Sequence, residues 1–302
     1  MNRSLILPLA ILFGLLCHQW CDIFMIFVPY LIFAILLLNF TAVDIRKLRL
    51  LRMTGMNISL LLFQILVSLG GYLLARCISQ DEIIAQGVLI AVLCPVASSS
   101  VVISCYLGAN RETVTAHVIL GNLMIAIAAP IYFSFIGIQQ DMPFFDSFLL
   151  ILKKVSPIIA LPFFMALALQ MWLPKVNGFV ARFKDWSLYL WAMALAFTLG
   201  RTIHFIFMHG KENLDSIIIL GIVSVFMCIL QFAIGKVIGR KYGDVVAGGQ
   251  MLGQKNSAMG IWMANIYLNP LASVSIALYA IWQNLFNSWQ MYAYEKNRKK
   301  QQ

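Results

Sequence analysis

Charged residues are rare in this chain, and acidic residues are the rarest. Asp, Glu, Lys and Arg make up 11% of the 302 residues, whereas hydrophobic residues make up 61%, and the mean hydropathy is +0.86. Soluble domains are about one quarter charged, so this composition excludes an ordinary soluble protein and places the chain in a lipid bilayer. The 12 acidic residues all lie in expected loops or at the ends of apolar segments. We therefore expect no acidic partner in the middle of a membrane span.

The sequence also lacks the patterns of a metal site, a disulfide framework and a nucleotide-binding loop. Its six cysteines are scattered, mostly within apolar segments, and its four histidines are dispersed. We therefore expect no metal and no cofactor. We also expect no ATP drive, because the glycine-rich phosphate loop is missing. The rival from another class is a membrane-embedded enzyme, for instance one that acts on lipids. It would need a carboxylate-rich metal site, a His/Cys cluster or a nucleophile with its base, so we expect no enzymatic activity.

The apolar residues form ten segments that we predict to cross the membrane, with nine as the alternative. A span needs about 20 apolar residues. The segments cover residues 4–18, 23–42, 55–75, 83–107, 113–137, 148–172, 187–207, 214–237, 245–268 and 270–292. We interpret the first as a retained span, because Leu15 and Leu16 stand where a signal-peptide cleavage site needs small residues. Residues 141–156 are predicted to form an interfacial helix that leads into the sixth span, with Lys153 and Lys154 on its polar side.

Basic residues gather in alternate loops. The net charge of +10 would suit a nucleic-acid partner, but the lysines and arginines lie in short loops between apolar runs. If the N-terminus is cytoplasmic, 16 of the 22 fall on the cytoplasmic side, five fall on the other side, and Lys255 is the remaining one. This asymmetry predicts a multi-pass protein of the plasma (inner) membrane with both termini in the cytoplasm. Its partner is then the lipid bilayer and not nucleic acid.

Two of the segments are interrupted at corresponding positions. Ten spans divide into two groups of five, residues 1–140 and 141–302, and an odd number of spans requires the second group to be inverted. The fourth segment of the first group is broken by Pro95, and the fourth of the second group by Gly253 in the run GQKNS. Interrupted segments in matching positions point to the binding site of a transporter. We therefore predict an all-α membrane protein of two inverted five-helix repeats with discontinuous fourth and ninth spans.

Lys255 is the most informative single residue. A lysine at mid-membrane costs about 2.5–3.5 kcal/mol on insertion scales. We interpret its ammonium as a substitute for a coupling cation that also attracts an anionic substrate. In a second interpretation it carries the coupled proton, because burial disfavours the charged form of an amine. A structural lysine that snorkels or pairs with a buried acid is the third possibility, but Lys255 is far from both ends of its span and has no mid-span acid.

Polar residues near the two breaks complete the predicted site. The serines after Pro95 lie at the N-terminus of a half-helix, where free N–H groups attract anions, although serines in membrane helices also bond backbone carbonyls. Amide side chains line the cavity or join helices. We expect His117 to be a hydrogen-bonded interior histidine, with a proton relay to Lys255 as the alternative. The predicted substrate-binding residues are Lys255, Asn256, Gln254, Ser98, Ser99, Ser100 and Asn284, and the predicted coupling residues are Lys255, His117 and Gln64.

These motifs resemble those of the bile acid:sodium symporter family over nearly the whole chain. The resemblance is carried by Cys94–Pro95 and the small residues that follow, by Gly253, Asn256 and Ser257, and by Trp282–Asn284 with Asn287 and Ser288. It implies two discontinuous helices that cross at mid-membrane, and a core and a panel domain that move against each other. It also implies transport of organic anions, including bile acids and small carboxylates, usually with sodium.

Most positions that hold sodium in the family carry other residues here. The resemblance places Gln64 at a matching glutamine. It places Met251 at the acidic position, Lys255 at a glutamine and Val101 at an asparagine. Two hydroxyl positions fall at Val114 and Val118 or, with a shifted register, at Thr113 or Thr115. Sodium needs several oxygen ligands. We therefore expect a secondary transporter of a bile acid-like anion or a small carboxylate that works without sodium, by proton coupling, exchange or uniport. The alternatives are a sodium symporter with a rebuilt site and a non-transporting receptor of the same fold.

Overall fold

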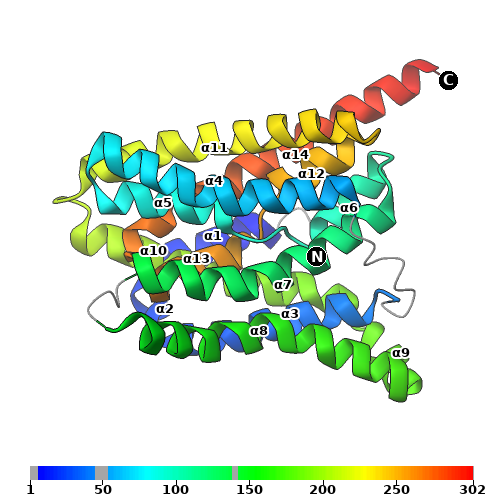
Figure 1. Cartoon of the computed structure of the whole chain (residues 1–302), viewed down its shortest axis with the longest axis horizontal. Helices are drawn as coiled ribbons and strands as arrows, with labels where there is room; N and C mark the ends of the chain where they lie inside the picture. The colour runs from blue at the N-terminus through cyan, green and yellow to red at the C-terminus, as the bar shows by residue number, and fades with distance from the viewer. Residues whose placement is uncertain (1–5, 45–53, 138–141, 302) are drawn as a thin grey trace.

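A computed structural model describes residues 6–44, 54–137 and 142–301, and within these ranges the chain is helical with no β-strand. In chain order the elements are α1 (Ile6–Leu16), α2 (His18–Phe24), η2 (Met25–Phe27), α3 (Val28–Thr41), α4 (Gly55–Ser79), α5 (Glu82–Leu93), α6 (Ser99–Tyr106), α7 (Arg111–Ile136), α8 (Phe144–Trp172), α9 (Pro174–Ala181), η4 (Lys184–Trp186), α10 (Ser187–His209), α11 (Leu214–Lys241), α12 (Val245–Gly253), α13 (Ser257–Tyr267), η5 (Pro270–Ala272) and α14 (Ser273–Gln301). They form one bundle in which α4 and α11 lie along one side and α3 and α8 along the opposite side (Figure 1).

Six helical segments of the described chain are long and apolar enough to cross a membrane. They are His18–Thr41, Gly55–Ser79, Arg111–Ile136, Phe144–Trp172, Lys184–His209 and Leu214–Lys241. Large apolar side chains such as Leu66, Ile222 and Phe226 are exposed on their outer faces, as expected of helices that contact lipid tails. The structure thus supports a multi-pass, all-helical membrane protein, whereas the layout of ten spans stays a prediction.

The predicted interfacial helix over residues 141–156 is wrong as a separate element. Phe144–Trp172 is a single continuous helix, and Pro157 and Pro162 lie inside it without ending it. Proline is tolerated in an apolar helix because neighbouring groups satisfy the freed carbonyls. Lys153 and Lys154 are exposed on the outer side of α8, as their polar character predicts. The polar face is therefore present, but it belongs to the same helix as the sixth predicted span.

The first predicted span is represented by a short helix. α1 contains 11 residues, which at 1.5 Å per residue is about 16 Å, roughly half of the apolar thickness of a bilayer. The chain turns at Cys17 and continues directly into the 24-residue segment His18–Thr41. α1 packs against α10, and Leu12 and Leu16 are exposed. Within the described residues, α1 is therefore shorter than a full span.

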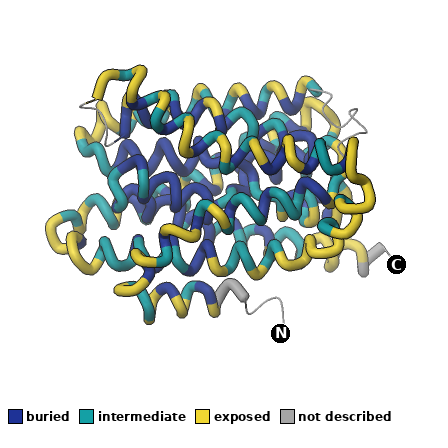
Figure 2. Tube along the Cα trace, turned by 90° about the horizontal axis from the view of Figure 1, so that it is seen from below, coloured by how far each residue is buried: buried dark blue, intermediate teal, exposed yellow. Residues whose placement is uncertain are grey.

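The interior of the bundle contains the interrupted helices. Every residue from Ile84 to Leu93 in α5 is buried, and α12 from Ala247 onward and nearly all of α13 are buried as well. Buried segments occupy the middle of the bundle and exposed segments its periphery (Figure 2). A helix that is apolar on all sides is stable only when it is covered on all sides. Both helix breaks therefore lie within protein, where non-helical backbone is tolerated in a membrane.

Candidate functional site at the paired helix breaks

The two interrupted helices meet at their breaks. Residues 94–98 separate α5 from α6, and residues 254–256 separate α12 from α13. Val96 and Lys255 form an isolated antiparallel β-bridge. Beside it, the N–H of Ala97 donates to the oxygen of Gln254 at 3.1 Å, and the N–H of Asn256 donates to the oxygen of Pro95 at 2.8 Å. Backbone groups that leave a helix inside a bilayer need partners, and each break provides them for the other.

Side chains from other elements satisfy the carbonyl end of α5. The ammonium Nζ of Lys255 donates to the oxygen of Val92 at 2.8 Å. Nε2 of Gln64 on α4 donates to the oxygens of Leu93 and Cys94, both at 2.8 Å. Nε2 of Gln231 on α11 donates to the oxygen of Ala91 at 3.1 Å. The last carbonyls of a helix lack partners within the helix and carry partial negative charge. The ammonium of Lys255 therefore sits at the negative end of a half-helix.

Lys255 is buried, and it has no ion pair with a carboxylate in the part of the chain that the structure describes. Only 2% of the residue is exposed, and the titratable groups beside it are the thiol of Cys94 and the ring of His117, both fully buried. The side chain of Gln283 on α14 bonds the main chain of Lys255 twice. The N–H of Lys255 donates to Oε1 of Gln283 at 2.7 Å, and Nε2 of Gln283 donates to the oxygen of Lys255 at 3.0 Å. An ammonium has three N–H donors. The bond to Val92 uses one of them, and Nζ makes no other hydrogen bond with the described residues.

Most of the predicted substrate-binding residues lie at the same place. Nε2 of Gln254 donates to Oγ of Ser99 at 2.7 Å, which joins the two breaks through side chains. Ser98 stands at the N-cap of α6 without a capping hydrogen bond from its side chain, whereas Asn256 caps α13 with its side-chain oxygen. Ser100 is fully buried, and its hydroxyl has no partner in the described residues. The first turns of α6 and α13 both begin here, and their positive dipole ends add to the attraction for an anion.

His117 and Asn284 are not joined to Lys255 by hydrogen bonds in the described structure. His117 on α7 is interior, which confirms one half of the prediction. The predicted hydrogen bond is not found, because neither ring nitrogen has a partner with good hydrogen-bond geometry in the described residues, although the ring faces the main chain of Met251. Nδ2 of Asn284 donates to the oxygen of Ala280 in its own helix at 2.6 Å. Asn284 is adjacent to Gln283, which reaches the break. A proton relay from His117 would need an intermediate group.

Three of the positions that the resemblance assigns to sodium ligands, Met251, Val114 and Val101, lie in or against one apolar cluster. Met251 and Val114 are fully buried in one group with Met56 and Leu60, and Val101 packs against it. Gln64, the one position that matches the family, donates its amide to main-chain oxygens. These side chains provide packing where a cation would need oxygen.

Several residues of the network were missed in the predicted site. Gln283 and Gln231 bond the breaks, the hydroxyl of Tyr279 donates to the oxygen of Gly253 at 2.7 Å, and Nε2 of Gln250 donates to Oδ1 of Asn287 at 2.8 Å. The available signal was a polar side chain within an apolar segment. That signal marks a buried polar group, but it does not identify the partner.

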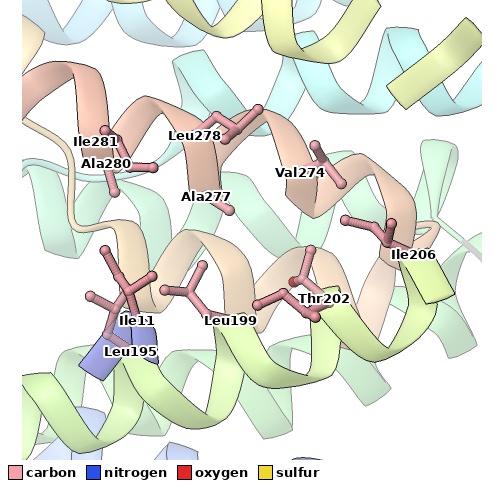
Figure 3. Close-up of a pocket in the computed structure, with 11 residues that line it drawn as sticks. Ile11, Leu195, Leu199, Thr202, Ile206, Val274, Ala277, Leu278, Ala280 and Ile281 are labelled. Carbon is pink, nitrogen blue, oxygen red and sulfur yellow. The ribbon is translucent and has the colours of Figure 1, made fainter. Parts of the chain in front are cut away.

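An apolar cavity of about 160 Å³ lies between α1, α10 and α14 (Figure 3). Its walls include Leu195 and Leu199 from α10 and Ala277 and Ile281 from α14, and most of its other lining residues are also aliphatic. The hydroxyl of Thr202 is engaged with Ser273 at 2.7 Å. A dry cavity of this size accepts a hydrocarbon group in preference to water. Along α14, Ile281 comes two residues before Gln283, so one helix lines the cavity and holds the break.

Gln64→Leu is expected to lower the free energy of unfolding by about 3 kcal/mol. The substitution keeps the side-chain volume but leaves two buried carbonyl oxygens of residues 93 and 94 without their donor, at about 1–3 kcal/mol each. The measurement is the melting temperature in detergent. Ser68→Ala on the same helix is the control, because its hydroxyl donates to the oxygen of Ile65 in its own helix and not to the break. Equal melting temperatures for the two variants would contradict the role of Gln64.

A scan against protein-family models finds no match to this chain. A search of curated proteins likewise finds no match.

Proposed function

We propose that the protein is a secondary transporter of an organic anion that works by alternating access and without sodium. The observation that carries the proposal is the buried ammonium of Lys255, bound to the carbonyl end of α5 with no ion pair in the described chain. Half-helix ends of this kind coordinate the coupling ion in secondary transporters, and half-helix N-termini face anionic substrates. Lys255 then takes the place of the ion, and the anion binds beside it at the starts of α6 and α13.

The order of the helices supports two inverted repeats of five spans, residues 1–140 and 141–302. Counting the segment from α2 to α3 as one span, the interrupted pair α5–α6 is preceded by α4 and followed by α7. In the same way the interrupted pair α12–α13 is preceded by α11 and followed by α14. The pairing of the two breaks is what a crossing of discontinuous spans requires. With this layout, the loop charges favour cytoplasmic termini in the plasma (inner) membrane.

The apolar cavity favours a substrate with a hydrophobic body. A small carboxylate offers no apolar group to such a cavity, whereas a bile acid-like anion does. The lining residues come from α1, α10 and α14 and include none of the residues at the two breaks, so in this proposal the cavity and the charge site at Lys255 are separate parts of the binding site. Ligand sites in proteins combine predominantly apolar walls with a few polar groups that fix orientation. Among the two expected substrate classes, the larger amphipathic anions are therefore our choice.

Uptake by the full chain in liposomes tests this function. A radiolabelled steroid conjugate and a small carboxylate are offered in choline buffer, with and without a proton gradient, and empty liposomes serve as the blank. We expect saturable uptake of the steroid conjugate that does not need sodium. Saturable binding without accumulation would instead identify a receptor of the same fold. An absolute requirement for sodium would identify a symporter with a rebuilt site.

Sodium is expected to leave the melting temperature of the purified protein unchanged when it replaces choline at constant ionic strength. A ligand that binds the folded state raises stability by mass action, by about 2.7 kcal/mol at 100 times its Kd. The double variant Met251→Glu, Lys255→Gln should gain a saturable rise, because it adds an acidic ligand and removes the ammonium. A saturable rise in the unmodified protein would show that a sodium site exists, and the role given to Lys255 would be wrong.

A further inference from the structure

Two histidines far apart in the sequence meet where α2 packs against α10. His18 is the first residue of α2, and His204 lies near the end of α10. Their Nδ1 atoms are 3.3 Å apart, although 186 residues separate them in the chain. Both side chains are half-buried and so remain accessible from outside the bundle. They lie on α2 and α10, apart from the helices that carry the paired breaks.

The separation of the two nitrogens suits a shared metal ion. Zinc binds imidazole nitrogen at about 2.0–2.1 Å in tetrahedral geometry, which places two ligand nitrogens about 3.4 Å apart. A hydrogen bond from a ring N–H is usually shorter, at about 2.9–3.0 Å. At 3.3 Å the two nitrogens are placed as two ligands of one metal would be, and without a metal the same contact is a hydrogen bond in which one ring donates to the other.

The surrounding contacts hold both rings in place. The ring of His18 packs on Phe207 with centroids 4.8 Å apart, and the two imidazole rings are inclined by 31° to each other. Four residues after His18 on α2, Asp22 pairs with Arg201 of α10 at 3.4 Å. This ion pair joins the same two helices beside the histidines. Metal ligands that are oriented before binding lose less conformational freedom when the metal arrives.

We propose that His18 and His204 bind a divalent transition metal of the zinc class, with water completing the coordination. Imidazole nitrogen is a preferred ligand for zinc, copper and nickel, whereas magnesium and calcium require oxygen. The bound metal ties α2 to α10 and stabilises the contact between the N-terminal helices and the rest of the bundle. The site is independent of substrate transport, so it stands or falls separately from the proposed function.

The test uses the full chain purified without a histidine tag. Its melting temperature is measured at increasing zinc concentrations, and magnesium serves as the negative control. We expect a saturable rise with zinc and none with magnesium. His18→Asn and His204→Asn should each weaken zinc binding at least about tenfold. The matched control is His209→Asn, an exposed histidine on the same helix as His204, which should bind zinc as the unmodified protein does. A Cys17→Ser variant should also retain binding, although Cys17 is next to His18.

A second measurement applies if a histidine variant does not fold. In the unmodified protein, zinc should protect His18 and His204 from acylation by diethyl pyrocarbonate and leave His209 reactive. The proposal is overturned if zinc produces no saturable rise, if His209→Asn or Cys17→Ser loses binding to the same extent, or if zinc gives no selective protection.

Discussion

Lys255→Met is expected to leave the protein folded and to reduce anion uptake on the order of 100-fold. Removing one partner of a buried charge pair costs about 2–5 kcal/mol, and about 3 kcal/mol corresponds to this loss in rate. In the proposed function, the partner that this substitution leaves unpaired is the substrate anion, because the described chain offers the ammonium no carboxylate. Initial uptake rates in liposomes measure the effect.

The same substitution should not lower the melting temperature. Burial of an ion that has no partner of opposite charge costs several kcal/mol, and methionine removes that cost while it fills a similar volume. The oxygen of Val92 loses its donor, which costs about 1–3 kcal/mol. These opposing terms predict a melting temperature that is equal or higher. Loss of function without loss of stability is the signature of a residue retained for binding.

Lys236→Met is the matched control for this experiment. Lys236 lies on α11 with its ammonium 5.0 Å from the ring centre of Phe286 and its side chain beside Gly249 of α12, and among the described residues it has no hydrogen bond with either break. The control changes the net charge by the same amount and should transport normally. Lys255→Gln separates the two interpretations of the lysine: loss of uptake at all pH values indicates a resident cation, and loss of the response to a proton gradient alone indicates a proton carrier. Normal uptake by Lys255→Gln at every pH would refute both.

Gly248→Ala is expected to destabilise the protein by about 3 kcal/mol, although it adds one methyl group. A Cβ at this position would lie 2.3 Å from the oxygen of Gly235 and 2.6 Å from Cα of Gly239. Both neighbours are backbone atoms of α11, so no side chain can move aside, and α12 must shift away from α11. Because α12 leads into the break, uptake should fall together with the melting temperature.

Gly70→Ala is the control for that prediction. Gly70 lies inside α4, and a Cβ there would have no atom within 4 Å. Alanine is about 1 kcal/mol more favourable than glycine in a helix interior, so this variant should melt at the same or a higher temperature. If the two alanine variants melt alike, the close contact between α11 and α12 is not a source of stability.

Local chemistry made the helix breaks predictable. Proline has no N–H to donate and disfavours the helical conformation of the residue before it, and α5 indeed ends at Leu93, just before Pro95. The run from Gly253 to Ser257 combines a glycine with polar side chains, and Asn256 caps the following helix. By contrast, Pro157 directly follows the end of the predicted interfacial helix, yet α8 continues through it, so a proline in an apolar segment does not by itself end a helix. The continuous α8 shows that exposed lysines alone do not divide a helix.

The partners of the buried polar side chains were not predictable in the same way. Gln283, Gln231 and Tyr279 are visible as polar residues in apolar segments, but each can bond any carbonyl that the packing brings within reach. The choice of partner depends on how helices separated by tens of residues lie against one another. The contact of His18 with His204 has the same origin, and no spacing in the sequence indicates it.

The amino-acid sequence by itself determined that this protein belongs in a bilayer, that two of its segments are interrupted, and that Lys255 lies in one interruption with no acidic residue in the middle of any predicted span. These properties follow from composition and from the backbone limits of proline and glycine, which act locally. The tertiary structure decided that the two interruptions bond to each other, that the ammonium binds Val92, and that Met251, Val114 and Val101 gather with other apolar side chains. These are contacts between distant residues, and only the packing of the helices brings such residues together.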